Sequence, residues 1–111
     1  MATERVIETI LKQLGGRQFI LMTGTKFSYG VDCKQQQYLC CLLPENLDTK
    51  SGINRFIITY NHVLDLYQIT LAQHHYNEYK IIKIFDDVYA SDLVTVFERE
   101  TGVCCTLTAL I

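Results

Sequence analysis

The chain has 111 residues and a net charge of −2, with 49% hydrophobic and 20% charged residues. This length and balance predict one folded domain over residues 1–111, and they exclude a disordered chain and a strongly basic nucleic-acid-binding protein. Apolar runs such as residues 38–43 are far shorter than the roughly 20 residues that cross a bilayer, so we expect no contact with a membrane.

The N-terminal sequence MATERVIETILK and the pattern of cysteines indicate in which cellular compartment the protein is found. Acidic residues interrupt the apolar positions of this segment and no small-residue cleavage site follows, so it does not resemble a secretory signal. The five cysteines are an odd number and include two adjacent pairs, which is unlike a disulfide framework. We therefore expect reduced thiols and a cytoplasmic location.

Helical spacing predicts a helix at each end of the chain. Apolar residues at 6, 7, 10, 11 and 14 predict a first helix over residues 4–14, which Gly15 and Gly16 terminate. A second helix is expected to begin near Ala90–Asp92 and to end at Gly102. The apolar tail, residues 103–111, is predicted to pair as a strand or to dock against a partner chain.

Short runs of aromatic and β-branched residues between these helices predict strands. The six runs are residues 17–22, 26–32, 36–43, 54–60, 65–73 and 78–85. Short connections favour hairpins between neighbours, and alternating apolar and polar residues favour one solvated and one buried face. The predicted fold is α+β, an antiparallel meander of five to six strands flanked by an N-terminal and a C-terminal helix.

Cysteine and histidine are present without the spacing of a metal site. No CxxC or HxxxH pair occurs, and neighbours such as Cys40 and Cys41 point to opposite faces of a regular strand. Phosphate-binding glycine loops are also missing, and no local sequence places a nucleophile beside a base. We therefore predict no metal, no cofactor and no enzymatic activity.

The segment from Tyr76 to Glu100 holds six acidic and three basic residues, a net charge of −3. It predicts a partner-binding acidic face with the residues Glu78, Asp86, Asp87, Asp92, Glu98 and Glu100, and with Tyr76 and Tyr79 as aromatic contacts. The alternative is an ordinary solvated surface, in which Asp86 and Asp87 serve only as favourable charges ahead of the second helix. Tyrosines interleaved with basic residues also leave base stacking open.

The order of motifs LKQLGG, QFILMTGTK, INRFIIT and FDDVYASDLVTVFERETG resembles a family of small proteins encoded by tailed phages and related mobile elements of gut bacteria. The most specific matching positions are residues 14–16, 22–24, 26, 53–54, 88–89, 93, 97 and 101–102. The cysteines at 40–41 and 104–105 depart from the pattern. The resemblance implies an accessory protein in the bacterial host cytoplasm.

Together with the acidic segment, the resemblance suggests that the chain acts by binding a host or phage protein. Its specific form would be an inhibitor of a bacterial defence system, similar to anti-CRISPR proteins. Two alternatives stay open: a protein that binds single-stranded nucleic acid, and a small assembly protein that associates with itself, for example as a homodimer.

Overall fold

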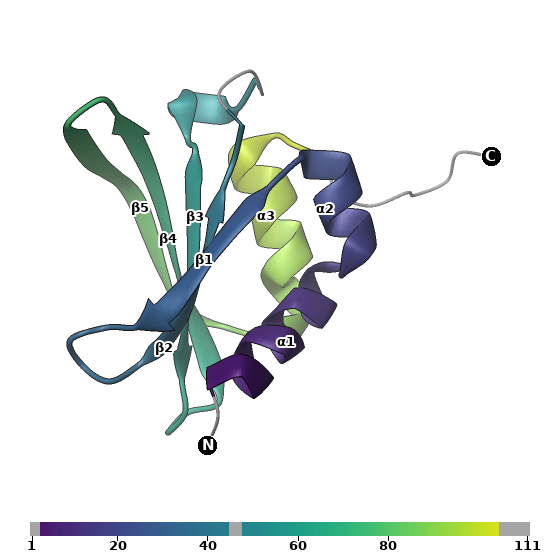
Figure 1. The fold of residues 1–111 in the computed structure, drawn as a ribbon, viewed down its shortest axis with the longest axis vertical. Coiled ribbons are helices and arrows are strands. Elements are labelled where there is room, and N and C mark those ends of the chain that lie inside the picture. The colour runs from purple at the N-terminus through teal and green to yellow at the C-terminus, as the bar shows by residue number, and fades with distance from the viewer. Residues whose placement is uncertain (1–2, 45–47, 105–111) are drawn as a thin grey trace.

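The computed structural model describes residues 3–44 and 48–104, which form three α-helices, two short 3-10 turns and one five-stranded sheet (Figure 1). The helices are α1 (Thr3–Leu14), α2 (Arg17–Thr23) and α3 (Leu93–Thr101). The strands are β1 (Lys26–Val31), β2 (Gln37–Leu42), β3 (Arg55–Asn61), β4 (Leu66–His75) and β5 (Glu78–Val88). The 3-10 turns are η1 (Lys50–Gly52) and η2 (Ala90–Asp92). The α+β prediction is confirmed.

The sheet is an antiparallel meander in which each strand pairs with the next one along the chain. Two turns use residues with positive φ, Asp65 between β3 and β4 and Tyr76 between β4 and β5. The turn after β3 is further closed by Asn61, whose Oδ1 accepts hydrogen bonds from the backbone N–H groups of Val63 and Leu64 at 3.1 and 3.2 Å. The predicted hairpin order is therefore correct.

All three helices lie on one side of the sheet, and the core fills the layer between them (Figure 1). Every second residue of the central strands points into this layer; the fully buried examples are Leu39, Cys41, Phe56, Ile58, Ile69 and Leu71. The period of two that alternates side chains between faces thus places one apolar set under the helices.

The chain turns sharply between α1 and α2 at two glycines. The Gly16 N–H donates to the Leu11 carbonyl at 2.8 Å, and the Gly15 N–H donates to the Lys12 carbonyl at 3.1 Å. These bonds form a Schellman motif, and Gly15 and Gly16 supply the positive φ that it needs. The predicted end of the first helix is confirmed.

The strand predicted over residues 17–22 is wrong, because this segment forms α2. Phe19 and Thr23 are buried four residues apart, and the Thr23 hydroxyl donates to the Phe19 carbonyl at 2.7 Å. Leu21, which a strand would place on the same face as Phe19, is 75% exposed. The glycine turn redirects the chain onto the core, and Phe19 then fits only with helical spacing.

The strand predicted over residues 78–85 is longer in the structure, because β5 continues to Val88 and so includes Asp86 and Asp87. A register shift lies in this part of the β4–β5 ladder, between the pairs Tyr67–Val88 and Ile69–Phe85. Asp87 adopts a φ of 56° there, so the two aspartates occupy an irregular strand end. Asp92 does lie at the start of the helix, in η2.

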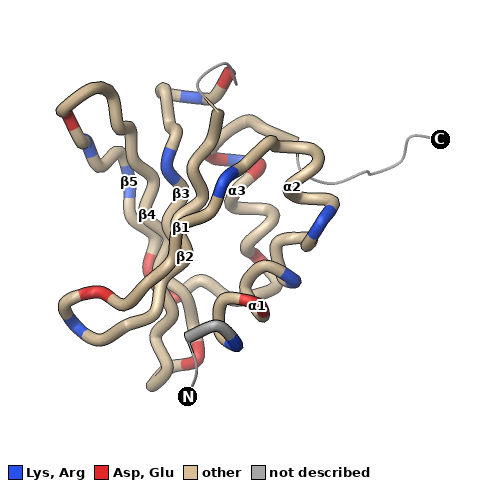
Figure 2. Tube along the Cα trace, in the orientation of Figure 1, with Lys and Arg blue, Asp and Glu red and all other residues tan. Residues whose placement is uncertain are grey.

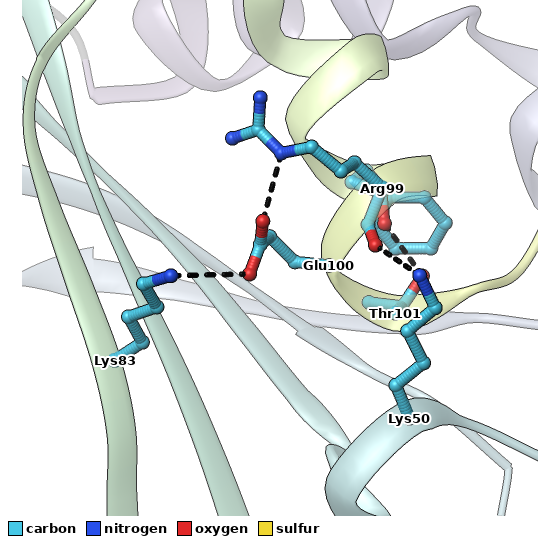
Figure 3. A network of polar contacts seen from close by, with 6 residues as sticks. Lys50, Lys83, Arg99, Glu100 and Thr101 are labelled. Atoms are coloured by element: carbon cyan, nitrogen blue, oxygen red, sulfur yellow. Dashed lines mark hydrogen bonds and ion pairs between the residues drawn. The ribbon is translucent and has the colours of Figure 1, made fainter.

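The C-terminal end of α3 is tied to the rest of the fold by a small polar network (Figure 3). Glu100 contacts Arg99 at 2.8 Å and Lys83 of β5 at 3.8 Å. The ammonium group of Lys50 donates to the Arg99 carbonyl at 2.8 Å, which joins η1 to the helix end. Helix α3 ends at Gly102 as predicted. Of the predicted C-terminal strand, residues 105–111 lie outside the described part.

Candidate functional site

The face of the sheet opposite the helices is the principal surface candidate. The β-sheet register defines which side chains share it, because directly paired residues point to the same side. We call this surface the open face; its members are Lys26, Ser28, Gly30, Tyr38, Cys40, Leu42, Arg55, Ile57, Thr59, Asn61, Leu66, Gln68, Thr70, Ala72, His74, Tyr79, Ile81 and Ile84. No helix among residues 3–44 and 48–104 covers it (Figure 1).

The open face is richer in apolar side chains than a solvated sheet face should be. Tyr79, Ile81 and Ile84 of β5 are 52%, 53% and 48% exposed. Toward the middle of the sheet, Cys40 and Ile57 are half-buried by their neighbours. An antiparallel sheet with one face in water normally carries polar residues there. The face is exposed to solvent as predicted, but it carries apolar side chains among its polar ones.

One end of the open face carries a polar cluster around His74. The side-chain amide of Asn54 donates to the His74 carbonyl at 2.8 Å, and its Oδ1 accepts from the His74 N–H at 2.8 Å. The guanidinium of Arg55 lies 3.4 Å from His74 Nδ1, and the rings of His74 and Tyr79 are 6.1 Å apart. Arg55 is thus held beside the apolar centre as a positioned cation.

The surroundings of two ionisable groups near this cluster, the Cys40 thiol and the Tyr79 phenol, raise their pKa values. Burial raises the pKa of the Cys40 thiol, and the positive charge of Arg55 opposes that rise. Burial is also the main cause that raises the pKa of the Tyr79 phenol. Both groups are therefore neutral near pH 7, and this part of the surface presents a thiol and a phenol rather than anions.

The other end of the open face is acidic. Asp86 accepts a hydrogen bond from the Gln68 amide at 2.8 Å. Together with Asp87, these residues border a hollow of about 70 Å³ that Thr59 and Asn61 also line. The open face therefore runs from a cationic end at Arg55, across apolar residues, to an anionic end at Asp86 and Asp87.

The six acidic residues predicted as one face are spread over several elements (Figure 2). Asp86 and Asp87 border the open face, and Asp92 follows in η2. Glu78 starts β5, nine residues before Asp87, which is about 30 Å along a strand. Glu98 and Glu100 belong to α3, on the helix side of the sheet, and Glu100 is paired with Lys83 and Arg99.

The two predicted aromatic contacts occupy different positions. Tyr79 belongs to the open face, whereas Tyr76 lies in the β4–β5 turn, is 85% exposed and packs edge-on against the His75 ring at 4.3 Å. Tyr79 therefore shares a surface with Arg55 and His74, and Tyr76 extends beyond it.

Cys33 and Cys40 are free thiols. Cys41 lies in the core and Cys40 on the open face, which confirms that the neighbours point to opposite sides. In the described part of the chain, residues 3–44 and 48–104, no group of three or more His, Cys, Asp or Glu residues could hold a metal ion. None of its helices is long and apolar enough to cross a membrane.

Comparison with known proteins adds no family to this geometry. No protein-family model matches the chain, and no curated protein or solved structure matches it either. The candidate site consequently rests on the residues of the open face themselves.

The sequence analysis did not predict the apolar residues of the open face, because it expected polar residues on the solvated side of the sheet. The signal was present in consecutive apolar residues on single strands, Cys40 to Leu43, Phe56 to Ile58 and Ile81 to Ile82. On a strand, consecutive apolar residues supply both faces, which is typical of sheets covered on both sides.

Proposed function

We propose that the chain is a phage or mobile-element accessory protein that acts by binding a protein of the host or the phage through the open face. The observation that carries this proposal is the apolar surface of Tyr79, Ile81 and Ile84, which is exposed in the described part of the chain beside the half-buried Cys40 and Ile57. Uncovered apolar surface with a polar rim is typical of protein interaction sites.

The charges at the two ends support a protein partner with a defined orientation. Arg55 is held by Asn54 and His74 at one end, while Asp86 and Asp87 mark the other. Opposed charges at the rim of an interface fix register and select partners more than they add affinity. The partner surface would be apolar at its centre, with an acidic group facing Arg55 and a basic group facing Asp86.

The specific form of the proposal is inhibition of a bacterial defence system, which the resemblance of the motif order to phage proteins supports. The test is to express the chain in bacteria whose defence nuclease blocks a phage and to count plaques. The wild type should restore plaques, and Ile84→Lys should fail to do so. The matched control is Leu21→Lys, on the helix side of the molecule, which should act like the wild type.

Direct binding separates the possible partners. The wild type, Ile84→Lys and Leu21→Lys are each used to capture partners from an infected lysate, with and without nuclease. The affinity of each protein for the purified partner is then measured. We expect Ile84→Lys to weaken it at least about tenfold, since a buried charge disrupts an interface centre. Double reversal of Asp86 and Asp87 to Lys should weaken it less, by slowing association.

Three results would contradict the proposal. Capture that disappears on nuclease treatment would assign the surface to nucleic acid. A homodimer that Ile84→Lys converts to a monomer, measured by light scattering, would assign it to a second copy of the chain. Equal partner binding by Ile84→Lys and Leu21→Lys would remove the open face from the interaction altogether.

A further inference from the structure

A second feature of the molecule lies on the helix side, at one end of the core. Where α1 diverges from the sheet, the layer between them opens into a cleft of about 720 Å³. Small-molecule sites in proteins commonly have volumes of 300–1,000 Å³. Its lining comes from α1, from strands β1 to β4 and from the β1–β2 and β3–β4 connections; the residues used below are Arg5, Gln13, Gln35, Tyr60, His62, Asp65 and Tyr67.

The floor of the cleft is a tyrosine pair. Tyr60 of β3 and Tyr67 of β4 are direct partners in the sheet register, and their ring centroids lie 5.5 Å apart. Tyr67 is buried at 5% exposure, whereas Tyr60 is only half-buried and offers part of its ring to the cleft. The core thus ends in aromatic surface rather than in aliphatic side chains.

Hydrogen bonds fix both phenols. The Tyr67 hydroxyl donates to Gln13 Oε1 at 2.7 Å, and the Tyr60 hydroxyl donates to Asp65 Oδ1 at 2.7 Å. Because the carbonyl of Gln13 accepts from Tyr67, its amide nitrogen extends from the other side of the same planar group. The floor is therefore rigid, with an amide donor placed at the edge of an aromatic surface.

The mouth of the cleft is polar and carries one guanidinium group, that of Arg5. The carboxylate of Asp65, which accepts from Tyr60, also belongs to the lining. Arg5 projects from the first turns of α1 and is exposed, and His62 lies in the turn after β3 on the same cleft. Gln35, in the β1–β2 connection, adds a second side-chain amide. Guanidinium groups bind phosphate through paired N–H donors, and glutamine amides match the donor and acceptor pattern of a base edge.

The partly exposed ring of Tyr60, inclined by 49° to the buried Tyr67 ring, the amides beside it and a guanidinium at the mouth correspond to the three parts of one ligand class. We propose that the cleft binds a nucleotide, with the base against Tyr60, its edge toward Gln13 and Gln35, and the phosphate at Arg5. Bases stack on tyrosine without strong sequence preference, which suits a single platform of this kind. The source is either a free mononucleotide or the 5′-phosphorylated end of a single strand.

The test measures binding of AMP, adenosine and a 5′-phosphorylated single-stranded oligonucleotide to the full chain by NMR titration. AMP should bind, with shifts concentrated at Tyr60, Gln13 and Arg5. Arg5→Gln should weaken AMP about tenfold and leave adenosine unchanged, because it removes only the phosphate contact. The matched control is Arg17→Gln, an exposed cation on α2 outside the cleft.

Tyr60→Ala should weaken AMP and adenosine alike, by about tenfold or more if stacking is lost. Tyr79→Ala on the open face is its control and should change neither. Binding by the oligonucleotide but not by AMP, with the same sensitivity to Arg5→Gln, would identify the strand end as the source.

Absence of binding by all three probes at millimolar concentration would overturn the proposal. So would binding that neither Arg5→Gln nor Tyr60→Ala alters. Since Arg5→Gln changes only an exposed side chain, its result stands even if Tyr60→Ala fails to fold. The open-face variant Ile84→Lys should still bind AMP, so failure of the protein-binding proposal and failure of this one are distinguishable.

Discussion

Phe97 of α3 meets Phe19 of α2 edge-on, with ring centroids 4.9 Å apart and planes inclined by 67°. The same Phe97 ring contacts Phe56 of β3 at 5.0 Å. Three aromatic rings therefore link two helices, far apart in sequence, to the central strand of the sheet. This contact places the short helix α2 over the core and makes its conformation testable.

Phe19→Ala should destabilise the protein by about 3–5 kcal/mol, since it removes a fully buried aromatic ring and leaves a cavity. Leu21→Ala should change stability by less than about 0.5 kcal/mol, because Leu21 is 75% exposed. Urea unfolding followed by circular dichroism measures both. Equal losses of unfolding free energy for the two variants would contradict the helical assignment of residues 17–22, because a strand places Phe19 and Leu21 on the same face.

The local conformation of α2 could not be read from RQFILM, whereas most of the other elements could. Four consecutive apolar residues carry no period, so aromatic and β-branched content favoured a strand. The deciding facts are tertiary: the Gly15–Gly16 turn and the space beside Phe97. The helices ending at Leu14 and Gly102 and the five strands of the meander were predictable because capping glycines and alternating residues are local signals.

The candidate sites were predictable only in part. Tyr79 and the pair Asp86–Asp87 were singled out by composition, and the structure places them at or beside the open face. Glu98 and Glu100 were grouped with them by sequence proximity, yet they lie in α3 on the helix side of the sheet, where Glu100 pairs with Lys83 and Arg99. The cleft depends on Arg5, Tyr60 and Tyr67 meeting across the fold, and no local pattern joins residues so distant along the chain.

Gly102→Ala should lower stability by more than about 1 kcal/mol. Gly102 has a φ of 77°, and a Cβ there would lie 3.2 Å from Lys50 Cγ. Left-handed backbone costs an alanine about 1 kcal/mol or more, and the contact adds to it. The two causes separate in a Lys50→Ala background, where only the backbone cost should remain. An unchanged cost in that background would show that the Lys50 contact contributes nothing.

Asp65→Asn should lower the pKa of Tyr60. The hydrogen bond to Asp65 is the main cause that raises the pKa of Tyr60 from 10.0 to about 12, and burial adds to the rise. Asn retains the positive φ of this position, so the turn should survive. NMR titration of ring-labelled tyrosine reports the change, with Tyr29 as an exposed reference. A Tyr60 pKa that stays near 12 would show that Asp65 is not its cause.

The same pair makes stability depend on pH in a defined window. A phenol with a raised pKa in the folded state keeps its full stabilising contribution below about pH 10, the pKa of an unfolded tyrosine. The contribution is lost as the pH rises through the folded value, about 12. The wild type should therefore lose stability relative to Asp65→Asn between these two values. Equal pH dependence of the two proteins would contradict this linkage.

Alkylation of the thiols should follow the geometry of β2. Cys33 is exposed, Cys40 is half-buried with a raised pKa, and Cys41 is fully buried in the core. Because the thiolate is the reacting form, Cys33 should be modified by iodoacetamide at neutral pH at least about tenfold faster than Cys40. Cys41 should react only when the protein unfolds, which peptide mass spectrometry can follow against urea.

The comparison between Cys40 and Cys41 is the informative one, since the two residues are neighbours and differ only in the face they occupy. If Cys40 lies on a surface that a partner covers, the purified partner should slow its alkylation and leave that of Cys33 unchanged. Modification of Cys41 before Cys40 in the native protein would reverse the assignment of the two faces, and the apolar surface proposed for binding would then be part of the core.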